Sequence, residues 1–326
     1  MLGIELTPDE PVSRLAEFAS TAAESDFDTV FLSHHYNNRD EFAALATIAR
    51  ETEDVRLGPG IANPYETHPV TLASRMATLD ELAGGRGVFG VGAGDRSTLA
   101  NLGFDHDDAL RRVLETMQVA RRLWDGERVD HDGTFVADDA GLNYEVGEIP
   151  VYVGAQGPHM TRMAAKYADG VLFNGSHPHD IEWAADRIAE GLAERDDYDR
   201  SEFDFAAYAS VSVAADAETA RDGARPPVAF ITAGAPSPVL ARHDIDEARA
   251  REIREALSAG EFSRGFEHVT AEMLDAFCIA GTPKTVGSRL DELLETADSV
   301  VVGSPLGPDV ADALTFLDAS LLSNQV

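Results

Sequence analysis

Short apolar runs alternate with longer segments of helical periodicity along most of the chain. Eight runs have the length and composition of buried strands, and they cover residues 2–6, 29–32, 55–58, 86–92, 150–154, 170–174, 203–213 and 299–302. Between them, apolar positions recur three and four residues apart, which is typical of helices packed on one face. Strands that alternate with helices through short turns favour a parallel sheet. We therefore predict an α/β fold, a (β/α)8 TIM barrel, with an open doubly wound sheet as the alternative.

Two segments interrupt this alternation. Residues 126–147 are polar, with scattered apolar positions between turn residues, and this pattern favours a hairpin. Residues 235–277 carry additional helical periodicity ahead of the last strand. Because no linker or break in composition divides the chain, we expect a single domain over residues 1–326, with insertions near 126–147 and 235–277. A length of 326 residues suits a barrel, a fold that starts near ~250 residues and grows by insertion.

The charge balance is strongly acidic. Asp and Glu number 58 against 26 Lys and Arg, which gives a net charge of −32, and Lys166 and Lys284 are the only lysines. In dilute buffer such self-repulsion opposes compaction, whereas at about 1 M salt the Debye length is ~3 Å and most of the repulsion is screened. The composition therefore predicts a protein adapted to molar salt. It offers no basic stripe, so neither nucleic acid nor an anionic membrane surface is expected as a partner.

The remaining composition narrows the class of protein further. Cys278 is the only cysteine, so neither an intrachain disulfide nor a cysteine metal cluster can form, and its apolar neighbours predict a buried thiol. The first residues lack the basic region of a signal peptide. No apolar run approaches the ~20 residues that a spanning helix needs. We expect a cytoplasmic protein with no membrane partner.

Polar residues follow several predicted strands at the point where each strand ends. Glu5 ends the first strand, and His34 and His35 follow the second. In a β/α barrel the loops after the strands meet at one face, which carries the chemistry. A carboxyl at position 5 could donate a proton if burial favoured its neutral form, and an acid held there for packing is the alternative. Two adjacent histidines point to opposite sides of a strand, so no metal site is expected.

Two glycine-containing segments at strand ends complete the set of candidate site residues. Residues 90–95 follow the fourth strand, and their glycines let a backbone approach a ligand closely. They lack the G-x-G-x-x-G spacing of a dinucleotide fingerprint, and Asp95 at their end is a candidate for chemistry or for capping a loop. Gln156-Gly157-Pro158 ends the fifth strand and begins a helix. Exposed N–H groups there, with Arg162 and Lys166, could hold an anion, and ordinary capping is the alternative.

The segments that follow the predicted strands together resemble those of a known family. The motifs that carry the likeness span the whole chain in order, and they are Gly3-Ile4-Glu5, His35-Tyr36-Asn37-Asn38, Gly58-Pro59-Gly60-Ile61-Ala62-Asn63-Pro64-Tyr65, Ala77-Thr78-Leu79-Asp80-Glu81-Leu82, Gly90-Val91-Gly92-Ala93-Gly94-Asp95, Gly154-Ala155-Gln156-Gly157-Pro158 and Gly303-Ser304-Pro305-Leu306-Gly307-Pro308. The pattern is similar to that of the coenzyme F420-dependent 5,10-methylenetetrahydromethanopterin reductases, a branch of the bacterial-luciferase-like superfamily. The acidic composition points to a haloarchaeal type.

The resemblance implies a barrel that binds coenzyme F420 at the carboxyl ends of the strands, without metal or flavin mononucleotide. It implies hydride transfer from reduced F420 to the methylene carbon of a tetrahydropterin, which gives the 5-methyl form. Glu5 would donate the proton that opens the methylene bridge, and Asp95 is the second catalytic candidate. The cofactor contacts that it implies are His35, Gly60, Ile61, Asn63, Gly92, Gly94, Gln156, Gly157 and Asn174. It also implies a cis peptide at Gly60-Ile61 and a homodimer or homotetramer.

One residue departs from the family pattern. Relatives carry Asp-His before Tyr-Asn-Asn, whereas this chain has His34-His35. The acid that relatives carry beside the ring pocket is therefore replaced by His34, and we assign no cofactor role to this position. The one-carbon carrier is either tetrahydromethanopterin or tetrahydrofolate, and the sequence does not separate them. Within the superfamily, another F420-dependent dehydrogenase or a flavin-dependent monooxygenase is the alternative function. A catalytically idle barrel that binds a partner is the alternative from a different class.

We predict that the folded state is lost as salt is lowered from molar to millimolar concentration. Less screening leaves the net charge of −32 to repel itself across the compact state. Far-ultraviolet circular dichroism along a KCl titration measures this loss. Full stability in millimolar buffer would contradict the prediction of salt adaptation.

Overall fold

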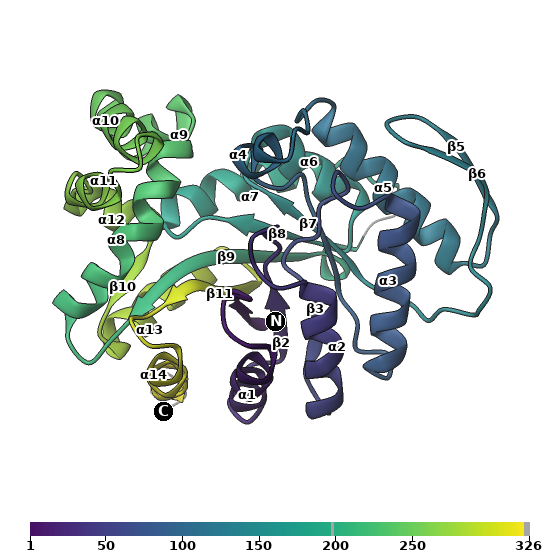
Figure 1. Ribbon diagram of the computed structural model, residues 1–326, viewed down its shortest axis with the longest axis horizontal. Coiled ribbons are helices and arrows are strands. Elements are labelled where there is room, and N and C mark those ends of the chain that lie inside the picture. The colour runs from purple at the N-terminus through teal and green to yellow at the C-terminus, as the bar shows by residue number, and fades with distance from the viewer. Residues whose placement is uncertain (197–198, 323–326) are drawn as a thin grey trace. The chain divides into compact units, whose positions relative to one another are not determined.

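The computed structural model describes residues 1–196 and 199–322. The chain falls into two compact units. The first unit comprises residues 1–174 and 184–206, and the second comprises residues 175–183 and 207–326. Both units contain strands and helices, and the two are described in turn (Figure 1).

Six parallel strands form the sheet of the first unit. In chain order they are β1 (Leu2–Leu6), β2 (Thr29–Leu32), β3 (Arg56–Pro59), β4 (Phe89–Val91), β7 (Val151–Ala155) and β8 (Gly170–Asn174). β1 pairs with β2, β2 with β3, β4 with β7, and β7 with β8, all in parallel. The bridges Leu57–Gly87 and Ala62–Val91 join the segment of β3 to that of β4. The six strands therefore run side by side in one direction.

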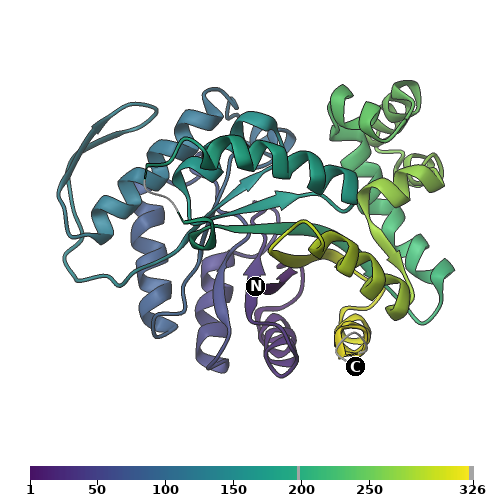
Figure 2. The ribbon, with the colours of Figure 1, turned by 180° about the vertical axis from the view of Figure 1, so that it is seen from behind.

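Helices alternate with these strands along the chain, as expected for β/α units. They are α1 (Val12–Ala23), α2 (Glu41–Glu51), α3 (Pro69–Leu82), α4 (Arg96–Asn101), α5 (Ala109–Trp124) and α6 (Pro158–Tyr167). Figures 1 and 2 show α1, α2 and α3 lying side by side along the strands. The side chains of Phe31, Phe89 and Phe173 are completely buried in this unit. Burying such a side chain stabilises the fold by about 1.5–3 kcal/mol.

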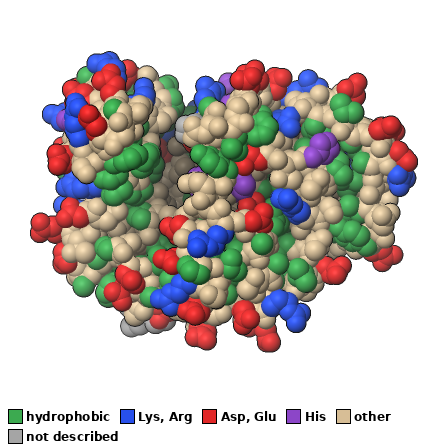
Figure 3. Space-filling model, in the orientation of Figure 1, with side chains coloured by type: hydrophobic (Ala, Val, Ile, Leu, Met, Phe, Trp, Pro, Cys, Tyr) green, Lys and Arg blue, Asp and Glu red, His purple; other side chains and the backbone are tan. Residues whose placement is uncertain are grey.

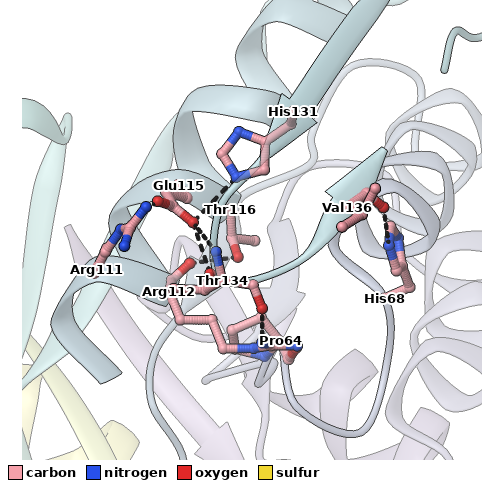
Figure 4. Close-up of polar contacts among 9 residues, drawn as sticks. All are labelled: Pro64, His68, Arg111, Arg112, Glu115, Thr116, His131, Thr134 and Val136. Atoms are coloured by element: carbon pink, nitrogen blue, oxygen red, sulfur yellow. Dashed lines mark hydrogen bonds and ion pairs between the residues drawn. The ribbon is translucent and has the colours of Figure 1, made fainter. Parts of the chain in front are cut away.

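A two-stranded hairpin extends from the first unit after α5. Its strands β5 (Val129–Asp132) and β6 (Val136–Ala140) pair antiparallel, and both ribbon views show it projecting outward (Figures 1 and 2). Glu115 of α5 fixes it, because this carboxylate accepts hydrogen bonds from Thr134 N and Thr134 Oγ1, each at 2.7 Å. His131 Nε2 lies 3.0 Å from the same carboxylate (Figure 4). Despite partial burial, these hydrogen bonds lower the pKa of Glu115 to about 2.

The second unit contains the later strands and most of the later helices. Its strands are β9 (Asp204–Val213, which begins in the first unit), β10 (Ile279–Gly281) and β11 (Ser299–Leu306), and β10 pairs parallel to β9. Its helices are α8 (Ala217–Gly234), α9 (Ser237–Arg242), α10 (Glu247–Ser258), α11 (Phe262–Glu267), α12 (Ala271–Phe277), α13 (Pro283–Leu294) and α14 (Val310–Leu322). Helix α7 (Pro178–Leu192) and the 3₁₀ turn η1 (Arg200–Glu202) complete the chain, and α7 runs from this unit into the first. Val228, Ile253 and Met273 lie in an apolar cluster that packs α8, α10 and α12 together.

The expected elements can be compared with this structure directly. All eight predicted strands are present, and β1, β2 and β8 have the predicted bounds. Residues 126–147 contain the hairpin, and residues 235–277 contain α9 to α12. Three short elements were not predicted, namely α4, β10 and η1. The single domain over residues 1–326 stays a prediction. In the described part of the chain, no helix combines the length and the apolar character needed to cross a membrane.

Candidate active site

The candidate residues lie at the carboxyl ends of the six strands of the first unit. Glu5 is the penultimate residue of β1, and Gln156 follows β7 directly. Asn174 is the last residue of β8, while Asn63 and Asp95 follow β3 and β4 within a few residues. Because the six strands are parallel neighbours, their carboxyl ends share one edge of the sheet. The structure therefore brings these candidates to a common edge.

Glu5 is a buried acid, with only 3% of its surface exposed. Its backbone is paired with Phe31 of β2. The Oγ1 hydroxyl of Thr7 donates a hydrogen bond to Glu5 Oε1 over 3.1 Å. A buried carboxyl is costly in its charged form unless hydrogen bonds or an opposite charge compensate it. The position thus combines burial with placement at a strand end, as the sequence predicts.

The segment after β3 is irregular and closely packed. The peptide bond Gly60-Ile61 is cis, as the resemblance implied. The side chain of Ile61 lies against Gly92 and Gly154, because a Cβ on either glycine would be 2.9 Å from an Ile61 side-chain carbon. Gly92 therefore makes room for Ile61 from the neighbouring strand segment. Its contact with a cofactor stays a prediction, as does that of Gly60 and Ile61.

Asn63 organises the turn that follows. Its Oδ1 accepts hydrogen bonds from the backbone N–H groups of Tyr65 and Glu66, each at 3.1 Å. Its Nδ2 donates to Glu66 Oε1 over 2.9 Å. Gly94, with a φ of +76°, packs closely beside it, since a Cβ there would lie 3.2 Å from Asn63 Cβ. Asn63 is thus fixed by its own turn and by the glycine after β4, and it is not free to adopt another rotamer.

His34 joins this turn to helix α2. Its Nδ1 lies 2.7 Å from Glu41 Oε2, and its Nε2 lies 3.1 Å from Glu66 Oε1. The first contact is a hydrogen bond, whereas the second lacks hydrogen-bond alignment and is mainly electrostatic. The imidazole is only 18% exposed, and the Glu41 side chain is almost completely buried. One ring therefore bridges two carboxylates from different elements.

These carboxylates decide the charge of His34. Burial by itself would lower the pKa of the imidazole, but the hydrogen bond and negative charge of Glu41, followed by those of Glu66, raise it to about 9. At neutral pH His34 is therefore an imidazolium. Its positive charge compensates the carboxylates of Glu41 and Glu66, whose uncompensated negative charge would destabilise the turn. His34 thus supports Asn63 through Glu66.

Arg112 of α5 holds the same turn from another direction. Its Nε donates to the carbonyl of Pro64 over 2.9 Å, and its Nη1 donates to the carbonyl of Thr134 in the hairpin (Figure 4). The guanidinium also stacks on the ring of Tyr65, with Cζ 4.8 Å from the ring centroid. Stacking and hydrogen bonding together use the planar geometry that distinguishes arginine from lysine. The loop after β3 is therefore anchored to α5.

The other candidates are more exposed. Asp95 caps α4, because its Oδ1 accepts from Thr98 N at 2.8 Å and from Thr98 Oγ1 at 3.0 Å. This geometry is the capping alternative, and a catalytic role of Asp95 stays a prediction. His35, Gln156, Gly157 and Asn174 are exposed at the same edge. Nothing lies within 4 Å of the position that a Cβ on Gly157 would occupy, so the start of α6 is open to a ligand.

The expected cations of α6 are already paired. Arg162 Nε lies 2.7 Å from Glu194 Oε1, and Lys166 Nζ lies 2.8 Å from Glu194 Oε2. Only the backbone N–H groups at the start of α6 therefore remain to attract an anion. Sequence reasoning missed Glu41, Glu66 and Arg112, which have no motif of their own. The two adjacent histidines were the only local sign that buried acids lie nearby.

The sequence of the chain was compared with protein families and with known proteins. The family model of luciferase-like monooxygenases matches residues 2–299. The chain belongs to this luciferase-like family. It is 41% identical to the 5,10-methylenetetrahydromethanopterin reductase of Archaeoglobus fulgidus, over 98% of both chains. It is 38% identical to the enzyme of the same name from Methanolobus tindarius, over 98% of this chain and 99% of that one.

A solved structure gives the same result for the fold. The coenzyme F420-dependent tetrahydromethanopterin reductase of Methanopyrus kandleri has a TM-score of 0.93 to this chain. The two are 36% identical, and the likeness covers 99% of this chain and 98% of the other. The predicted (β/α)8 TIM barrel of the luciferase-like family is thereby confirmed. The predicted resemblance to the reductase branch of the luciferase-like family is confirmed as well.

We predict that His34→Gln removes a pH-dependent part of the stability of this luciferase-like chain. The folded pKa of about 9 is above the unfolded value of 6.5, so the contribution is complete below pH 6.5 and is lost as pH rises through 9. Partial exposure limits it to about 1–2 kcal/mol. Denaturant unfolding at constant salt, at pH 6 and pH 9.5, measures it.

The matched control is His35→Gln, which changes the neighbouring exposed ring. This variant should keep the wild-type decline in stability between the two pH values. If wild type and His34→Gln lose the same stability as the pH rises, the imidazolium does not hold the turn.

Proposed function

We propose that this chain is an F420-dependent oxidoreductase that reduces a 5,10-methylene-tetrahydropterin to the 5-methyl form. The observation that carries this proposal is the full-length similarity to proteins named 5,10-methylenetetrahydromethanopterin reductase, at 38–41% identity. The reaction acts on a CH–NH group of the carrier. The carrier is a pterin, either tetrahydromethanopterin, as in the names of the relatives, or tetrahydrofolate.

The edge of the first unit fits a flat cofactor such as F420. The half-exposed Gly60-Ile61 segment offers a surface formed by backbone and one apolar side chain. The open approach at Gly157 and the exposed amide of Gln156 offer room and hydrogen bonds at β7. Asn63, which is held rigid by Glu66, offers a defined boundary at β3. When bound, reduced F420 supplies a hydride.

Glu5 supplies the proton in this proposal. The methylene carbon bridges two nitrogens and accepts a hydride poorly. Protonation of one nitrogen breaks its bond to that carbon and leaves an iminium, which accepts a hydride well and becomes the N-methyl group. A buried carboxylic acid at the edge of the sheet can deliver this proton without admitting bulk water. Glu5 then needs a proton from solvent before the next turnover.

The remaining residues position the reactants rather than move protons. His34, through Glu66 and Asn63, and Arg112, through Pro64, keep the loop after β3 in one conformation. Preorganised loops raise rates because less freedom is lost when the reactants come together. Asp95, His35 and Gln156 are proposed to contact the pterin or the deazaflavin from the exposed part of the edge.

Anaerobic turnover tests the function. We expect reduced F420 to be oxidised when methylene-tetrahydromethanopterin or methylene-tetrahydrofolate is added, as followed by the absorbance of oxidised F420. Assays of the two carriers side by side, in molar KCl, identify the better substrate. If neither carrier is reduced while secondary alcohols or sugar phosphates reduce oxidised F420, the chain is a different F420-dependent dehydrogenase.

We predict that Glu5→Gln keeps the affinity for F420 but lowers kcat by about 10²-fold or more, because a carboxamide cannot donate the proton. Fluorescence titration of F420 measures binding, and the turnover assay measures kcat. Glu10→Gln makes the same chemical change at an exposed position and should leave both unaltered. Near-normal turnover of Glu5→Gln would remove this residue from the mechanism.

A further inference from the structure

A cavity of about 200 Å³ lies inside the second unit, between α8, α12, β10 and α13. Three arginines line it, two from α8 and one from α13, namely Arg221, Arg225 and Arg289. Leu274 and Ile279 give it an apolar wall, and the thiol-bearing Cys278 lies beside them. Neither the strand-end chemistry nor the sequence motifs involve these residues.

The arginines are only partly satisfied by the protein. Arg225 donates through Nε to Asp222 Oδ1 at 3.1 Å and through Nη1 to the carbonyl of Val269 at 3.0 Å. Arg289 Nη1 lies 3.4 Å from Asp275 Oδ1. Its buried Nε has no hydrogen-bond partner among the described residues, although Glu292 Oε2 lies 3.5 Å from it as an ion pair. A guanidinium carries several N–H donors in a planar fork. Donors therefore remain for a further acceptor.

Arg221 is exposed and is the least engaged of the three. No ion pair or hydrogen bond joins its guanidinium to any residue in the described part of the chain, although it is four residues from Arg225 on the same helix. Like charges at this spacing destabilise a helix. Asp275 also lines the cavity, and its side chain is 68% exposed, while that of Asp222 is 65% exposed. Three arginines in the lining against this one carboxylate leave the cavity with a net positive charge.

This arrangement is unusual for a chain with 58 acidic and 26 basic residues. The space-filling view shows acidic side chains spread over the face that it displays, with fewer basic ones (Figure 3). At a distance such a molecule repels anions, so only a local group of cations can retain one. Arginine suits this purpose because its fork matches carboxylate and phosphate oxygens.

We propose that this cavity is a binding site for a small organic anion, in which Arg221, Arg225 and Arg289 hold a carboxylate or phosphate group. The hydroxyl of Thr285, at the start of α13, is a further donor in the lining. Leu274 and Ile279 contact the short carbon chain that bears the anionic group. The volume admits one such group with a few carbon atoms. The site is independent of the proposed reductase function, because all its residues belong to the second unit.

Calorimetric titration tests the site on the whole protein in molar KCl at constant ionic strength. The probes are inorganic phosphate and glutarate, with uncharged glutaramide as the neutral counterpart of glutarate. We expect at least one anion to bind saturably, one per chain, and glutaramide not to bind. Phosphate binding alone would identify a phosphate ligand, and glutarate binding alone would identify a carboxylate ligand. Binding of neither anion would overturn the proposal.

Variants locate the bound anion. Arg221→Gln should weaken binding by about tenfold or more, equivalent to ~1.4 kcal/mol. It should not impair folding, because this exposed guanidinium makes no hydrogen bond or ion pair within the described residues. Arg289→Gln should weaken it similarly. Arg251→Gln removes the same charge at an exposed position on α10 and should leave the affinity unchanged. Equal weakening in all three variants would show a general charge effect and refute the site.

Cys278 provides an independent readout. It is the only cysteine of the chain and it lines the cavity, so its reaction with methyl methanethiosulfonate reports on this place alone. Burial raises the pKa of this thiol to about 12, so the reaction is slow and easily timed. A saturating anion should slow it further in the wild type and much less in Arg221→Gln. An unchanged rate in the wild type would place the anion elsewhere and overturn the proposal.

Discussion

Parallel pairing of the strands is the constraint on which the candidate site depends. Each of β1, β2, β3, β4, β7 and β8 ends at the same edge of the first unit, so residues separated by most of the chain become neighbours of one surface. A one-residue slip in any of these strands would turn inward-facing side chains outward. The burial of Glu5 and the exposure of Gln156 thus follow from register as much as from residue type.

The loop after β3 shows how that edge is given a fixed form. Backbone pairing between β3 and β4 is interrupted around Gly60 and Ile61 and resumes at Ala62. Side-chain contacts stabilise the backbone where these hydrogen bonds between strands are missing. Ile61 packs on Gly92 and Gly154, and Asn63 is hydrogen-bonded within its own turn. The anchors of this loop are charged, namely the imidazolium of His34 and the guanidinium of Arg112. The irregular backbone is therefore held by Arg112 from helix α5 and by His34, which is itself hydrogen-bonded to Glu41 of helix α2.

Periodicity predicted the eight strands but left an open doubly wound sheet as the alternative to the barrel. The three-residue strand β4 was found because it lies within the longer run 86–92, whereas the three-residue β10 and the six-residue α4 leave no repeating pattern. Glu5 was predicted from its place at a strand end. Asp95 shows the limit of such reasoning, since a cap and a catalytic acid occupy the same kind of position.

Contacts between segments that are distant along the chain could not be predicted from the sequence. Nothing in the spacing of Glu41 or Glu66 indicates that both would meet His34, because their approach depends on how α2 and the β3 loop fold onto β2. The cis peptide at Gly60-Ile61 came from the resemblance and not from the physics of the residues. Site residues that act on a ligand leave a motif, whereas residues that hold them in place leave none.

The acidity of the chain decides which interactions can hold such a site. At about 1 M salt the Debye length is ~3 Å, so charges that are exposed and further apart hardly interact. The contacts of His34 are 2.7 Å and 3.1 Å long and mostly buried, so they keep their strength where long-range repulsion has vanished. Short and largely buried ion pairs are therefore the electrostatic contacts that stabilise the site at both high and low salt. In dilute buffer the same pairs must resist a net charge of −32, which they offset only locally.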